Sequence, residues 1–299
     1  MPVRTFSISF VQVDFMADTN TFLSDVLRRE YQNQLNDQRF TYETGDYAFQ
    51  LSNITVRNEG ASNESFHGVI HKLRLNNLPQ LGSRDGSTDD IDLGDFEGVV
   101  EKNYFTFYRN RELLIYQNHR EGTGMHDLTL FFSDLAGHTC SLNPVLKPEA
   151  YLRLINEDHP LTKIELSISK PNLELFNQEH SSDQFSRQLA TLARTTNTHN
   201  IKITLGTPRN MATRISDTLK SSLAHLAGHS ARTAKAWTEN SSHPIDLIAD
   251  RIKDQITVSM HGHYPNSNDM ITAIEQARIR NSEDIANSLS EINHSDRTN

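Results

Sequence analysis

Apolar and polar residues alternate along much of the chain, and this alternation predicts a protein rich in β-strands. In residues 4–14 the apolar side chains of Phe6, Ile8 and Phe10 occupy every second position. A period of two is typical of a strand with one buried face. Similar patterns predict further strands at residues 47–57, 66–75, 104–108, 112–117, 161–170, 201–205 and 254–260. Two of them flank Arg109-Asn110-Arg111, which predicts a hairpin with a basic turn.

Other segments repeat apolar residues every three or four positions, and this spacing predicts helices. In residues 21–35 the side chains of Phe22, Val26 and Tyr31 share one face, and Asp18 and Thr19 are candidate caps. The same spacing predicts helices at residues 125–136, 182–195, 211–227 and 269–292, and a short helix or strand at 150–155. Polar, turn-rich sequence predicts a loop at 76–95 and a linker at 172–182.

The order of these elements predicts the fold class. Strands come mostly first and helices mostly later, which favours an α+β fold over regularly alternating βαβ units. We expect a mixed or antiparallel sheet in an N-terminal domain of residues 1–175. A smaller basic α/β domain would follow at residues 176–262, and a C-terminal helix and tail at residues 263–299.

Composition narrows the cellular setting. The chain has 299 residues and one cysteine, Cys140, so no intramolecular disulfide can form. This fits a reducing compartment. The N-terminal residues lack the apolar core of a signal peptide, and no run of about 18 apolar residues is present. The sequence therefore predicts a cytoplasmic protein without membrane insertion.

One segment has a charge opposite to that of the rest of the chain. Residues 181–235 carry a net charge of +6, although the whole protein is −9. A cationic segment on an acidic body indicates a surface for a polyanion, with nucleic acid as the first candidate. The predicted phosphate contacts are Arg187, Arg194, Lys202, Arg209, Arg214, Lys220, Arg232 and Lys235. A secondary basic set in the N-terminal domain is Lys72, Arg74, Arg109, Arg111 and Arg120.

Searches for catalytic motifs give no candidate. The sequence has no phosphate-binding Walker loop and no complete dinucleotide fingerprint. Gly228-His229-Ser230-Ala231-Arg232 lacks the second glycine of a serine-hydrolase elbow. The sequence therefore indicates no catalytic residue, metal ligand or cofactor, and it favours a role without enzyme activity over an enzyme.

Several stretches of the chain carry a resemblance to a known protein family. They are His71-Lys72-Leu73-Arg74 followed by Asn77-Leu78-Pro79, and residues 91–122, 163–171 and 243–258. Their order of strands and loops resembles that of the Rex A-like exclusion proteins of lambdoid phage and related bacterial anti-phage defence proteins, over about residues 1–290. The resemblance implies a dimeric DNA-binding protein without enzyme activity that acts in phage defence or exclusion.

The sequence is compatible with three functions. The first is a non-enzymatic component of a bacterial or prophage defence system that binds nucleic acid, with duplex DNA preferred, as a homodimer and with a possible partner protein. The second is a structural or regulatory protein-interaction component with no nucleic-acid role. The third is a metal-dependent nuclease built around Asp158, Glu165 and Lys170, which lie on or beside one predicted strand.

Overall fold

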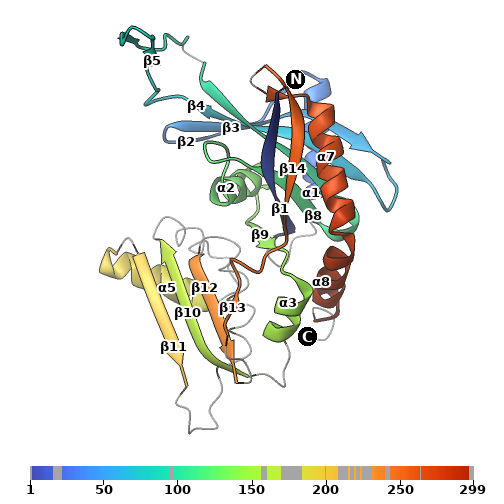
Figure 1. Cartoon of the computed structure of the whole chain (residues 1–299), viewed down its shortest axis with the longest axis vertical. Helices are drawn as coiled ribbons and strands as arrows, with labels where there is room; N and C mark the ends of the chain where they lie inside the picture. Colours follow the sequence, from blue (N-terminus) through green and yellow to red (C-terminus); the bar gives the residue numbers. More distant parts are fainter. Residues whose placement is uncertain are drawn as a thin grey trace.

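A computed structural model describes most of the chain. The described residues are 2–15, 22–94, 97–155, 160–169, 184–198, 200–207, 231–239, 243–262 and 264–295, with Ile215, Leu219 and Leu223 between them. Within this part, strands form one large and one small antiparallel sheet, and helices pack against both (Figure 1). The predicted α+β class is confirmed.

The large sheet holds nine described strands. Their order is β15-β14-β1-β8-β7-β4-β3-β2, and β9 also pairs with β1. The strands are β1 Val3–Phe15, β2 Thr41–Thr44, β3 Tyr47–Arg57, β4 Ser65–Arg74, β7 Val99–Tyr108, β8 Leu113–Asn118, β9 Cys140–Pro144, β14 Lys253–His261 and β15 Tyr264–Pro265. Because β1 is long, β14 pairs with its first half and β9 pairs with its second half.

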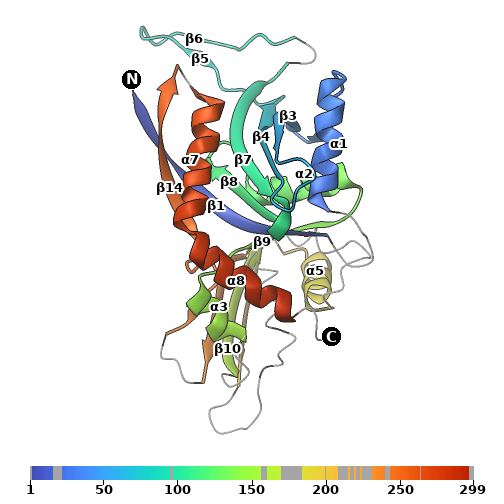
Figure 2. The same cartoon turned by 90° about the vertical axis from the view of Figure 1, so that its right-hand side faces the viewer.

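Helices cover both faces of this sheet, so its central strands are buried on both sides. The helices α1 Leu23–Leu35 and α2 Met125–Ala136 pack on one face, with Phe131 in that core. The helices α7 Ser267–Arg280 and α8 Ser282–Ser295 contribute Ile274 and other residues to the core on the opposite face. Figure 2 shows α7 and α1 on opposite sides of the strands. Double burial explains why the run Leu113–Tyr116 of β8 is apolar without a break.

The small sheet has four described strands in the order β11-β10-β12-β13. They are β10 Leu161–Ser169, β11 Asn200–Gly206, β12 Ala231–Thr238 and β13 Ile245–Asp246. Two helices, α3 Pro148–Ile155 and α5 Gln184–Thr196, add apolar residues to its core. The predicted loop at 76–95 contains a minor exposed hairpin of β5 Leu81–Gly82 and β6 Thr88–Asp89.

Backbone and side-chain contacts join the two parts of the molecule. Ser288 of α8 donates a hydrogen bond from Oγ to the carbonyl oxygen of Leu146, at 2.6 Å. Leu146 belongs to the small-sheet core and forms a β-bridge with Arg251, which precedes β14. The helix α8 therefore contacts the region that links the two sheets.

The sheets divide the chain at other positions than the predicted boundaries after residues 175 and 262. The strand β10, expected in the first domain, lies inside the small sheet, and β14 lies in the large sheet beside β1. These positions depend on pairing between strands that are far apart in sequence, which a local pattern does not record. Three predicted features lie outside the described residues: the caps Asp18 and Thr19, the whole linker at 172–182, and most of the helix at 211–227.

The single helix predicted at 269–292 is wrong, because α7 ends at Arg280 and α8 begins at Ser282. Asn281 lies between them and donates from Nδ2 to Asp254 Oδ2 on β14, at 2.9 Å. The guanidinium of Arg280 donates to the same oxygen, at 2.8 Å. These bonds fix the junction to the sheet and interrupt the helix, although apolar spacing continues across both helices.

Among the described residues, no helix combines the length and apolar character that crossing a membrane requires.

Candidate functional site

The structure places four of the eight predicted phosphate contacts with their side chains. Arg187 and Arg194 are exposed on α5, Lys202 is exposed on β11, and Lys235 is half-buried on β12. Arg209, Arg214 and Lys220 lie outside the described residues, and so does the side chain of Arg232 on β12.

These four residues occupy two layers of the small-sheet region. The helix α5 packs on the apolar face of the sheet, where Leu189 joins the core. Lys202 and Lys235 alternate with core residues of their strands and therefore lie on the other face. The expected single cationic face is thus not formed by these four side chains.

The secondary basic residues lie on and around the large sheet. Lys72 is held in place, because Nζ contacts Asp127 Oδ2 at 3.2 Å and lies 4.3 Å from the ring centre of Tyr47. Arg74 also lies over Tyr47, at 5.9 Å. The side chain of Arg120 is 95% exposed, and its Nε lies 3.6 Å from the carboxylate of Glu121. These positions favour local structural roles over a shared binding surface.

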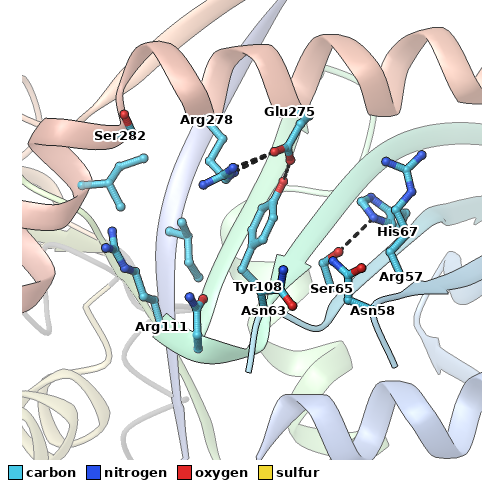
Figure 3. A pocket seen from close by; sticks show the side chains of 13 residues that line it. Arg57, Asn58, Asn63, Ser65, His67, Tyr108, Arg111, Glu275, Arg278 and Ser282 are labelled. Carbon is cyan, nitrogen blue, oxygen red and sulfur yellow. Dashed lines mark hydrogen bonds and ion pairs between the residues drawn. The ribbon is translucent and has the colours of Figure 1, made fainter. Parts of the chain in front are cut away.

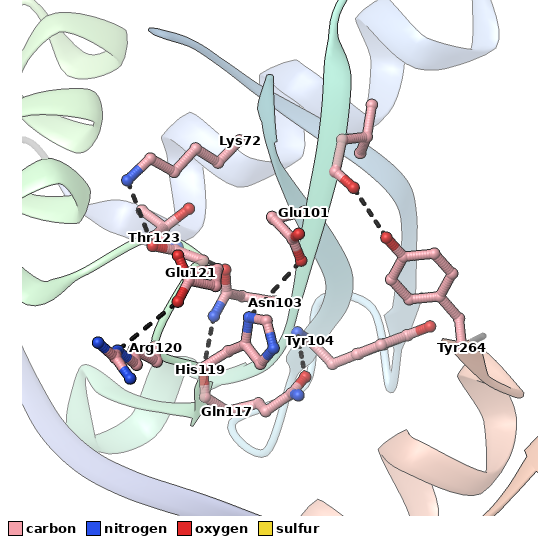
Figure 4. Close-up of polar contacts among 12 residues, drawn as sticks. Lys72, Glu101, Asn103, Tyr104, Gln117, His119, Arg120, Glu121, Thr123 and Tyr264 are labelled. Atoms are coloured by element: carbon pink, nitrogen blue, oxygen red, sulfur yellow. Dashed lines mark hydrogen bonds and ion pairs between the residues drawn. The ribbon is translucent and has the colours of Figure 1, made fainter. Parts of the chain in front are cut away.

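A buried amide anchors the loop that carries Arg120. Asn103 of β7 donates from Nδ2 to the carbonyl oxygen of Gln117, at 2.9 Å, and its Oδ1 accepts from the amide of Thr123, at 2.7 Å (Figure 4). Gly122 packs directly against this amide. Because Asn103 is fully buried, both of its bonds replace bonds to water. The network holds the loop between β8 and α2 against the sheet.

The remaining basic residues lie at the turn between β7 and β8, and one of them opens onto a pocket. The predicted hairpin with a basic turn is confirmed, with a 3₁₀ turn at Arg109–Arg111. Arg109 lies 3.7 Å from the buried carboxylate of Glu64 and is partly neutralised by it. Arg111 lines a polar pocket of about 320 Å³.

Strand register builds the floor of this pocket. Arg57 of β3 pairs with Ser65 of β4, Ser65 with Tyr108 of β7, and Tyr108 with Leu113 of β8. Residues paired directly across antiparallel strands present their side chains on the same face. One row across four strands therefore supplies four of the lining residues, and His67 lies two residues along β4.

Helices α7 and α8 form the opposite wall. Glu275 of α7 accepts a hydrogen bond from the hydroxyl of Tyr108 and is 2.7 Å from Nη2 of Arg278 (Figure 3). The guanidinium of Arg278 also lies 4.9 Å from the ring centre of Tyr108. Burial alone would raise the pKa of Glu275, but the hydrogen bonds from Arg278 and Tyr108 outweigh it and hold that pKa below its usual range. Glu275 is therefore ionised and fixes Arg278.

Two further guanidinium groups in this pocket are not neutralised. Among the described residues, neither Arg57 nor Arg111 has a side-chain hydrogen bond or an ion pair. In the view of Figure 3, Arg111 and Arg57 lie at opposite ends of the pocket, with Arg278 between them. The described lining thus has three guanidinium groups against the one carboxylate of Glu275. This local excess is positive, whereas the whole protein is −9.

The imidazole of His67 is a neutral part of this site. Its Nε2 is 3.2 Å from Ser65 Oγ and its Nδ1 is 3.0 Å from Thr106 Oγ1. Burial, with a smaller contribution from the charge of Arg57, lowers the pKa of His67 to about 4. Both ring nitrogens are occupied, so the ring positions the neighbouring hydroxyls.

This lowered pKa predicts a loss of stability in acid. The folded-state pKa lies below the unfolded value, so the stabilisation is complete above about pH 6.5 and is lost as the pH falls towards about 4. Between about pH 7 and pH 5 the wild type should lose about 2 kcal/mol of unfolding free energy more than His67→Gln, which cannot be protonated. Urea unfolding at both pH values measures the difference. Equal losses in the two proteins would contradict a buried neutral His67.

Sequence patterns identified only one residue of this pocket, Arg111, as a candidate. Arg57 lies at the end of a predicted strand, and Glu275 and Arg278 lie on a predicted helix. The sequence pattern therefore gives no reason to distinguish these three residues from ordinary surface residues. The basic hairpin turn was the available signal. Only strand register and the packing of α7 bring the other residues to it.

Comparison with known proteins gives one family match. A sequence model described as "Family of unknown function (DUF6731)" matches residues 17–287, which is most of the chain. No curated protein matches the chain.

Proposed function

We propose, for a chain that belongs to the DUF6731 family of unknown function, that the polar pocket binds a compact phosphate-bearing ligand. The observation that carries the proposal is the pair of uncompensated guanidinium groups of Arg57 and Arg111, which line one hollow together with Arg278. Unpaired positive charge on the wall of a pocket favours an anionic ligand.

The chemistry of the pocket favours phosphate over a single carboxylate. Arginine presents several N–H donors in a planar fork that matches the oxygens of a phosphoryl group. Asn58, Asn63 and Ser282 add neutral amide and hydroxyl groups that suit a polar remainder such as a sugar. A volume of about 320 Å³ lies at the small end of the range for ligand pockets, so the ligand is a small molecule.

The geometry supports binding more than catalysis. The carboxylate of Glu275 is occupied by Tyr108 and Arg278, and both nitrogens of His67 already have hydroxyl partners. Burial raises the pKa of Tyr108, and its bond to Glu275 raises it further, so the phenol keeps its proton. Groups held in this way position a ligand and are poorly placed to exchange protons with it.

Titration calorimetry with inorganic phosphate, pyrophosphate and adenosine monophosphate tests the proposal. We expect saturable binding of at least one of these probes at low salt, weaker binding as salt is added, and no binding of ribose. Tighter binding of a dicarboxylate such as succinate than of every phosphate probe would contradict the proposed ligand class. The absence of binding by all phosphate probes would remove the function.

Phage defence, protein interaction and nuclease activity, the functions indicated by the sequence, remain predictions. Three predictions rest on the resemblance to the Rex A-like proteins and on the charge pattern: a role in phage defence, homodimer formation and a partner protein. For the nuclease hypothesis, Asp158 and Lys170 lie outside the described residues, and the described part of the chain contains no group of three metal-ligating side chains. Glu165 is on β10, where its carboxylate is 2.6 Å from Nζ of Lys163. That contact favours an ion pair at this position.

A further inference from the structure

One face of the small sheet carries polar side chains, which are exposed or half-buried where the structure describes them, and it is separate from the pocket. The helices α3 and α5 contribute their apolar residues to the core on the face that carries Ile164, Leu166 and Ala234. Alternate residues of these strands point to the other face. Figure 1 looks onto that face, with α5 behind the sheet. We call it the open face of the small sheet.

Strand register sets the pattern of side chains on the open face. Three rows of paired residues cross it, and they are Gly206–Lys163–Trp237, Thr204–Glu165–Lys235 and Lys202–Ser167–Thr233. Asp246 of β13 extends the second row beside Lys235. The face therefore combines three lysines, two carboxylates, three hydroxyls and one indole.

The lysines gather around one carboxylate. Nζ of Lys163 is 2.6 Å from Glu165, and this hydrogen bond lowers the pKa of Glu165. The charges of Lys202 and Lys235 lower that pKa further, so both lysines act on the carboxylate of Glu165. Lys202 is exposed, and no ion pair of its side chain is formed with a described residue. Nζ of Lys235 lies 3.6 Å from Asp246 Oδ2. The described side chains of the face therefore carry three positive charges and two negative charges, a small local excess of positive charge in an acidic protein.

An aromatic side chain lies beside these charges. Trp237 is half-buried on β12, and Nζ of Lys163 is 4.5 Å from its ring centre. Trp237 is the one tryptophan of the chain. An indole that stays partly exposed in a polar face offers a surface on which a planar base can stack.

We propose that the open face of the small sheet binds single-stranded nucleic acid. Lys202, Lys235 and Lys163 would contact backbone phosphates, and Trp237 would stack on a base. Four strands at a spacing of about 4.8 Å give room for roughly three or four nucleotides. Duplex is disfavoured, because a flat sheet with a stacking indole suits unpaired bases. This inference does not depend on the proposed pocket function.

Intrinsic fluorescence tests this directly, because all tryptophan emission comes from the open face. We expect oligothymidylate of about ten nucleotides to quench the emission at low salt, and added salt to reverse the quenching. Lys202→Gln with Lys235→Gln should weaken binding about tenfold or more. Trp237→Phe should weaken binding about tenfold when affinity is measured by anisotropy of a labelled strand.

Matched variants separate this site from the others. Arg187→Gln with Arg194→Gln removes the same charge from α5 behind the sheet and should leave affinity unchanged. Arg57→Gln with Arg111→Gln alters the pocket and should also leave it unchanged, so failure of one proposal is distinguishable from failure of the other.

Three outcomes would overturn the inference. They are no binding at low salt, tighter binding of a duplex of the same length, or equal binding and quenching by polyglutamate. The last would assign the open face to an acidic peptide.

Discussion

Replacing Arg57 and Arg111 together with glutamine is expected to weaken the binding of pyrophosphate about a hundredfold. Each substitution removes a charged donor from the pocket wall and leaves a shorter, uncharged polar side chain. Because neither guanidinium has a partner among the described residues, the unfolding free energy should change little. Calorimetry gives the affinity, and urea unfolding gives the stability.

A matched control for this double variant is Arg120→Gln. Arg120 is 95% exposed on the loop after β8, away from the pocket lining, and its loss changes the net charge in the same direction. If Arg120→Gln weakens binding as much as a pocket substitution, the attraction comes from the overall charge and not from the pocket. Arg278 is a poorer choice for a first variant, because its removal leaves Glu275 partly buried without its ion pair.

Gly122→Ala is expected to lower the unfolding free energy by about 3 kcal/mol. A β-carbon at this position would overlap Asn103, coming within 2.8 Å of Nδ2 and closer still to Oδ1. Asn103 would have to leave its two bonds, and the carbonyl of Gln117 and the amide of Thr123 would lose their partner inside the protein. Urea unfolding of the purified variant measures the loss.

A double-mutant cycle identifies the cause of this loss. If the clash with Asn103 is responsible, Gly122→Ala should cost little in an Asn103→Ala background, because the space is then free. Gly124→Ala is the control, since a β-carbon there meets nothing within 4 Å. Additive losses in the cycle, or equal stability of the Gly122 and Gly124 variants, would contradict this packing account.

The sequence predicted the elements of this fold better than their assembly. Strands such as β1 and β3, and the helix α2, follow apolar periods that the chain displays locally. The sequence pattern does not predict the strand β12. Its buried side chains are the small Ala234 and Ala236, which give only a weak alternation of apolar and polar positions. The membership of β10 and β14 in their sheets depends on long-range pairing, so the predicted boundaries did not follow it.

For the same reason, only one residue of the candidate site, Arg111, could be predicted from the sequence. The basic turn at Arg111 is visible as a local pattern, whereas the row from Arg57 to Tyr108 exists only after three strands adopt their register. Clustering of charge along residues 181–235 pointed to a single face, but alternation along β11 and the position of α5 place Lys202 and Arg187 on different layers. Proximity in sequence therefore overestimated proximity in space.

The central claim is that the pocket lined by Arg57, Arg111 and Arg278 binds a phosphate group. A crystal structure of the protein with pyrophosphate, at a concentration that saturates it in solution, tests this most directly. The account predicts phosphate density inside the pocket, in contact with the guanidinium group of Arg57 or of Arg111. An empty pocket under those conditions, or pyrophosphate bound at another place on the protein, would contradict it.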